Sequence, residues 1–67
     1  MKLKVLLHPA EEGGFWAEVP GLPGCVSEGD DVRETLSNIR EAAEGWIEVA
    51  TERAVVGLDA QVTEIEL

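Results

Sequence analysis

The sequence predicts a small α+β domain in which a short antiparallel sheet lies against one helix, in the order β-β-β-α-β. Residues 2–8 and 15–19 alternate between apolar and other side chains, as the strands of a half-buried sheet do. Residues 32–50 repeat apolar side chains at helical spacing. The stretch GGFWAEVPGLPGCVSEG at 13–29 is rich in glycine and proline, which indicates a strand, a rigid turn and a further strand.

Length and composition indicate one domain spanning residues 1–67. A domain of this size hides only about 60% of its unfolded surface, which favours self-association as a source of stability. We therefore expect a homo-oligomer, a dimer or higher. A single cysteine excludes an intrachain disulfide and suits a reducing cytoplasm, where we expect the protein to reside. Neither a signal peptide nor a membrane-spanning run is recognisable, so no membrane partner is expected.

The formal net charge is -9. Phosphate backbones repel such a chain, which argues against direct nucleic-acid binding. Two interpretations remain. Acidity keeps a small protein in solution, or it speeds the encounter with a basic protein.

The first two strands predict a hairpin whose register brings like side chains together. The connection is formed by residues 9–13, where a proline, two acids and a glycine indicate a turn. The expected partners are Leu7 with Phe15, Val5 with Ala17 and Leu3 with Val19 on one face, and Leu6 with Trp16 and Lys4 with Glu18 on the other.

The turn after this hairpin is built from two Pro-Gly steps around a leucine, Pro20-Gly21-Leu22-Pro23-Gly24. Proline restricts φ and glycine accepts a positive φ, so the turn should be rigid. Leu22 is expected beneath it. Cys25 begins a short third strand and is expected to be a small buried residue rather than a nucleophile, because no motif surrounds it.

Gly29 and Asp30 end the third strand, and Asp31 is a predicted N-cap with Glu34 completing a capping box. The helix is expected to end near Arg53. Its apolar stripe is Val32, Leu36, Ile39, Ala43, Trp46, Ile47 and Ala50, and its opposite face carries Glu34, Glu41, Glu44, Glu48 and Glu52. That acidic face is either solvated or turned toward a basic partner. Residues 62–67 are β-prone and predict a final strand along a free sheet edge, with their facing left open.

The residues give little support for catalysis. One histidine and one cysteine cannot form a tetrahedral zinc site in one chain. A metal-dependent nuclease built on Glu18 and Glu28 is an alternative, but surface acids explain these residues better. His8 is expected to be exposed rather than catalytic. We therefore assign no catalytic, cofactor-binding or metal residue, and no cofactor.

Trp16 is predicted to lie on the sheet face away from the helix, beside Leu6 and flanked by Lys4 and Glu18. Exposed aromatic and aliphatic side chains rimmed by charge often mark interfaces. The alternative is that Trp16 caps a ragged sheet edge. The expected partner-binding residues are Leu6, Trp16, Glu18 and Leu22.

The motif GGFWAEVPGLPGC at 13–25, the Glu28-Gly29-Asp30 step and the helix opening VRETL at 32–36 closely resemble the N-terminal domain of HicB-type antitoxins. The resemblance covers nearly the whole chain and rests on these structural-motif residues: Gly14, Phe15, Pro20, Gly21, Pro23, Gly24, Cys25, Gly29 and Asp31.

This resemblance implies a β-β-β-α-β fold like a truncated ribonuclease H domain, without an intact catalytic carboxylate set. It also implies an antitoxin that binds a small basic HicA-type toxin, which cuts messenger RNA with a histidine. Many relatives carry a C-terminal DNA-binding domain. With the chain ending at Leu67, we expect a short form that does not bind DNA by itself. A stand-alone oligomeric module with a structural or ligand-binding role is the alternative.

Overall fold

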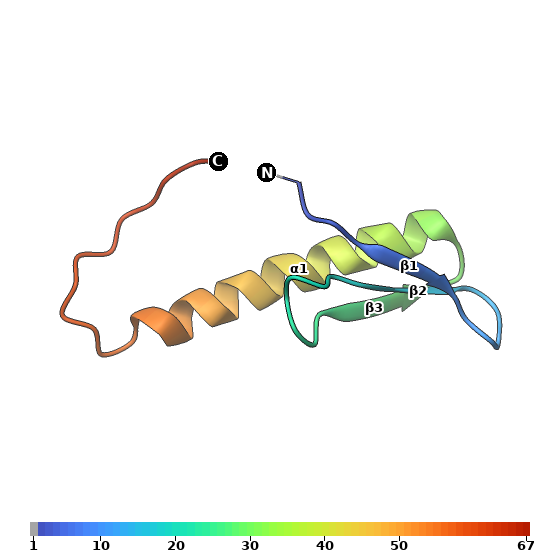
Figure 1. Ribbon diagram of the computed structural model, residues 1–67, viewed down its shortest axis with the longest axis horizontal. Helices are drawn as coiled ribbons and strands as arrows, with labels where there is room; N and C mark the ends of the chain where they lie inside the picture. Colours follow the sequence, from blue (N-terminus) through green and yellow to red (C-terminus); the bar gives the residue numbers. More distant parts are fainter. Residues whose placement is uncertain (1) are drawn as a thin grey trace.

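Three strands and one helix follow one another in the computed structural model, which describes residues 2–67 (Figure 1). The strands are β1 (Leu6–Pro9), β2 (Phe15–Glu18) and β3 (Val26–Gly29), and the helix is α1 (Val32–Val55). The sheet is antiparallel with the order β1-β2-β3, and α1 packs against β3 and β2. The predicted α+β arrangement, an antiparallel sheet with one helix on one of its faces, is confirmed.

The β1–β2 hairpin differs from the predicted register by two residues. Leu7 lies opposite Ala17 and His8 opposite Trp16, whereas Leu7 was expected opposite Phe15. The strand also begins at Leu6 and includes Pro9, which an edge strand tolerates because the missing N–H is not needed there.

The short loop between the two strands sets this register. The N–H of Ala10 donates to the carbonyl of Gly14 at 3.0 Å, and the N–H of Gly13 donates to the carbonyl of Ala10 at 3.2 Å. Gly13 and Gly14 both have positive φ, 103° and 74°, which glycine adopts readily. A shift of two residues exchanges the partners but keeps every side chain on its predicted face.

The turn between β2 and β3 consists of two successive hydrogen-bonded turns. The N–H of Leu22 donates to the carbonyl of Val19 at 3.0 Å, and that of Cys25 donates to Leu22 at 2.9 Å. In the second turn Gly24 has φ 82°, as the third residue of a type II turn requires. The indole N–H of Trp46 donates to the carbonyl of Pro23 at 3.0 Å, so the turn is also fastened to the helix.

Helix α1 starts where the capping residues predict. The N–H of Glu34 donates to the Asp31 carboxylate at 2.8 Å. The Glu34 carboxylate accepts in return from the N–H of Asp30 at 3.2 Å, one residue earlier than an ideal capping box. The hydroxyl of Thr35 donates to the carbonyl of Asp31 at 2.7 Å.

The core between sheet and helix is small. Its buried apolar side chains are Ala17, Val19, Cys25, Ile39 and Ala43. Cys25 is thus the buried residue that was expected. Only part of the predicted helical stripe is covered, because Val32, Leu36 and Ile47 remain 39–43% exposed. The short sheet leaves much of the apolar side of the helix without a neighbour.

The predicted final strand is not formed. Among the described residues, those from 58 onward pair with no strand, and Figure 1 shows them as an extended tail beyond the end of α1. A strand needs a partner for its backbone hydrogen bonds, and in the isolated chain this tail has none. The helix runs to Val55, two residues beyond the expected end.

Candidate partner-binding surface

The sheet face opposite α1 carries six side chains in two rows, and we call it the open face. Side chains alternate along each strand, and Ala17 of β2 is buried on the helix side. Its neighbours Trp16 and Glu18 therefore point the other way. The strand register places one row across the sheet as Leu6–Glu18–Val26 and the next as His8–Trp16–Glu28.

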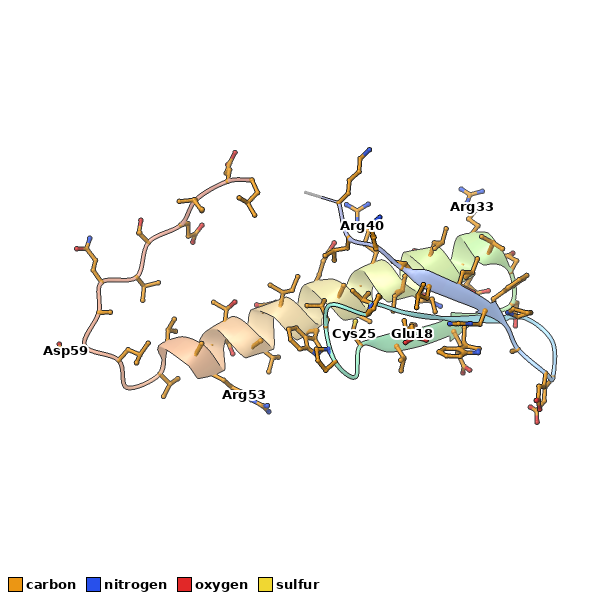
Figure 2. The ribbon with its side chains drawn as sticks, viewed as in Figure 1. Glu18, Cys25, Arg33, Arg40, Arg53 and Asp59 are labelled. Atoms are coloured by element: carbon orange, nitrogen blue, oxygen red, sulfur yellow. The ribbon has the colours of Figure 1, made fainter. Side chains whose placement is uncertain are left out.

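A cluster of His8, Trp16 and Glu18 forms the centre of the open face. The rings of His8 and Trp16 stack at a centroid distance of 4.1 Å and an interplanar angle of 19°. His8 Nε2 lies 3.0 Å from a carboxylate oxygen of Glu18. These contacts hold the indole in place, so a partner that binds it has less side-chain entropy to remove. Figure 2 shows Glu18 under the sheet, on the side away from α1.

Apolar side chains flank this cluster without being covered. Trp16 is 37% exposed, Leu6 48% and Val26 59%. On the same face, Glu18 lies between Leu6 and Val26, and Glu28 lies beside Trp16. An aromatic anchor with aliphatic neighbours and a charged rim is the usual composition of a protein–protein interface.

The predicted site residues divide into two groups. Leu6, Trp16 and Glu18 share the open face, as expected. Leu22 does not join them, because it is partly buried against the core, in agreement with its expected place beneath the turn. The register shift also brings Leu6, rather than Lys4, opposite Glu18.

Sequence reasoning missed His8, Val26 and Glu28 as members of this surface. His8 was placed on the correct face, but the expected register put Leu6 beside the indole. Val26 and Glu28 could have been found from the alternation in β3, where Ser27 points toward the helix side.

The acidic face of α1 offers a second charged surface. Its five glutamates are all exposed, and only Glu44 has a basic partner among the ion pairs of residues 2–67, with Arg40 at 3.2 Å. Exposed charges of this kind add little to affinity but raise the rate of encounter with an oppositely charged protein.

The carboxylates do not converge. Glu18 and Glu28 lie in different rows, with Glu18 opposite Val26 and Glu28 opposite Trp16. Within residues 2–67, no three His, Cys, Asp or Glu side chains are close enough together to hold a metal ion. No helix in this part of the chain has the length and apolarity needed to cross a membrane.

Comparison with known proteins gives this architecture a family. Residues 3–66 match the family described as HicB_like antitoxin of bacterial toxin-antitoxin system. The chain therefore belongs to the HicB-like antitoxin family, which is a family of antitoxins and not of enzymes.

The curated relatives that match the chain are described as UPF0150 proteins. The protein ssl0259 of Synechocystis sp. is 32% identical over 69 residues, which cover all of this chain and 94% of the relative. Protein Ta0767 of Thermoplasma acidophilum is 42% identical over 48 residues, covering 72% of this chain and 70% of the relative. No solved structure matches the chain significantly.

Proposed function

We propose that this protein neutralises a small basic HicA-type toxin by direct contact, with the open face as the binding surface. Membership of the antitoxin family supports a toxin partner in general. The observation that carries the proposal is the partly exposed Trp16, held by His8 and Glu18 among uncovered aliphatic side chains. Such a fixed aromatic group is the typical anchor of an interface.

Charge supports the choice of partner. A chain with net charge -9 attracts a basic protein that itself binds RNA. Occupation of the basic surface by this protein would exclude the RNA phosphates from it. The exposed glutamates of α1 contribute to the encounter, and Trp16, Leu6 and Val26 contribute to the stability of the complex.

The protein would act in the cytoplasm, where messenger RNA is cut, and would do so as a homo-oligomer. Self-association is supported by the small core of five buried apolar side chains and by Leu36 and Ile47, two exposed apolar residues of the helix. A domain of this size gains stability by covering such surface with a second copy.

Growth rescue tests the proposal. A HicA-type toxin from the same genome is expressed together with the wild-type chain, with Trp16→Ala or with the control Val49→Ala. Val49 is 47% exposed on α1, so the control removes an exposed apolar side chain elsewhere. We expect rescue by the wild type and the control, and weaker rescue by Trp16→Ala. If the wild type neither rescues growth nor retains the toxin in a pull-down, the antitoxin role is wrong.

A further inference from the structure

An apolar groove lies beside the open edge of the sheet, on the side opposite the open face. It has a volume of about 390 Å³ and is formed by Leu3, Val5 and Val19 together with residues 36–47 of α1. Its apolar lining includes Leu3, Val5, Leu36, Ile39 and Ile47. Leu3, Leu36 and Ile47 are each 39–43% exposed. The groove is therefore a part of the core that the chain leaves unfilled.

The tail of the chain, residues 58–67, has the complementary composition. Val62, Ile65 and Leu67 are 63–83% exposed. They belong to a stretch of sequence, residues 61–67, that favours β-structure. In an extended segment Ile65 and Leu67 point to one side, and Glu64 and Glu66 to the other. The tail thus has one apolar and one acidic side over its last four residues.

The segment beside the groove likewise has apolar and charged residues in alternating positions, but here the charged residues are basic. In the segment that leads into β1, Leu3 and Val5 line the groove, whereas Lys2 and Lys4 do not line it and are exposed. If the tail adds to this edge as a strand with Ile65 and Leu67 in the groove, then Glu64 and Glu66 face the same side as Lys2 and Lys4. This holds for a parallel or an antiparallel strand, because alternation alone determines it.

Basic residues are scarce in this chain, which makes their position informative. Five lysines and arginines are present among 67 residues. Two of them, Lys2 and Lys4, lie on this edge, and a third, Arg40, lines the groove. Figure 2 shows Arg40 beside the N-terminal segment. Three of the five basic residues therefore lie around this apolar groove, although Glu44, the ion-pair partner of Arg40, lines it as well.

In the isolated chain the tail does not occupy its own groove. Helix α1 extends past the sheet, and the tail leaves the end of the helix and turns back in the direction of the N-terminal segment without joining the sheet (Figure 1). The radius of gyration is 14.7 Å, whereas a compact chain of this length has roughly 11 Å. Ten extended residues span roughly 33 Å, and the groove runs along about 18 Å of helix. The tail is thus long enough to fill the groove of a neighbouring molecule.

We propose that two copies exchange their tails, each placing residues 61–67 as a strand along residues 2–5 of the other and burying Ile65 and Leu67 in its groove. This deepens the self-association proposed above by naming the segment and the surface that join the copies. The addition of a strand to a free sheet edge is a common mode of association. The open face stays free for a different partner.

Charge reversal in the full chain tests the exchange. One variant carries Glu64→Lys with Glu66→Lys, and the other carries Lys2→Glu with Lys4→Glu. Each variant alone sets like charges opposite each other at both exchanged tails, so its dimer dissociation constant should rise at least about tenfold. Mixing the two variants restores opposite charges at both contacts, and a dimer with one copy of each should return. Light scattering after size exclusion and native mass spectrometry measure both effects.

Two matched controls separate this contact from net charge. Glu41→Lys with Glu48→Lys changes the net charge as the first variant does, and Arg33→Glu with Arg53→Glu changes it as the second does. Both should dimerise like the wild type. A monomeric wild type, reversal variants that dimerise normally, or a mixture that stays monomeric would each overturn the proposal. Toxin capture by the same variants is measured separately, so a failed exchange is distinguishable from a failed antitoxin role.

Discussion

Replacing Gly14 by alanine should destabilise the protein severely. Gly14 has φ 74°, and a Cβ built there would lie 2.6 Å from the carbonyl oxygen of Gly29. The left-handed backbone alone costs an alanine about 1–2 kcal/mol. Forcing a methyl group against a backbone oxygen adds about 1–3 kcal/mol. The expected loss in the free energy of unfolding is therefore about 2–5 kcal/mol.

This loss is large for a chain of 67 residues. At roughly 0.05–0.15 kcal/mol per residue, the whole stability is about 3–10 kcal/mol. Thermal and urea unfolding followed by circular dichroism measure the change, at matched protein concentration because an oligomer's stability depends on it. The melting temperature should fall by at least about 8 °C.

Gly24→Ala is the matched control for this substitution. Gly24 has a similar φ of 82°, but a Cβ there would meet no atom within 4 Å. Its loss should therefore be about 1–2 kcal/mol, from the backbone alone. If Gly14→Ala costs no more than Gly24→Ala, the close approach of the β1–β2 loop to Gly29 does not matter, and the reasoning is refuted.

Three further substitutions test the helix and its junction with the sheet. Gly45→Ala should raise the free energy of unfolding by up to about 1 kcal/mol, because a Cβ at this helical position meets nothing within 4 Å; an unchanged or lower value in urea unfolding would contradict this. Asp31→Ala should lower the free energy of unfolding by about 1 kcal/mol, because the N-cap is lost. Asp30→Ala should lower it less, because the backbone N–H of residue 30 still donates to Glu34. Gly29→Ala should lower the melting temperature clearly, since its Cβ would lie 2.6 Å from the Thr35 nitrogen, and an unchanged melting temperature would show that this junction can relax.

Local signals in the sequence predicted the parts of the fold that depend on local contacts. The start of α1 follows from Asp31 and Glu34, whose capping bonds join residues three or four apart. The face of Trp16 follows from alternation along one strand and survives the error in register. The buried position of Cys25 follows from its place between a rigid turn and a strand.

The features that were missed depend on contacts between distant residues. The hairpin register was chosen by matching side chains, but the loop with Gly13 and Gly14 at positive φ determines it. The stacking of His8 on Trp16 is a consequence of that register. The final strand was predicted from β-prone residues and a free sheet edge, but neither signal guarantees the backbone pairing that a strand needs, and residues 58–67 pair with no strand in the structure.

The central claim, that the open face binds a toxin through Trp16, is tested most directly by titration. At 37% exposure, the indole offers a partner roughly 90 Å² of about 250 Å², worth about 2 kcal/mol. Calorimetry with a HicA-type toxin that lacks its catalytic histidine should therefore give a dissociation constant about 30-fold higher for Trp16→Ala and nearly unchanged for Val49→Ala. Equal affinities for the wild type and Trp16→Ala would contradict the claim.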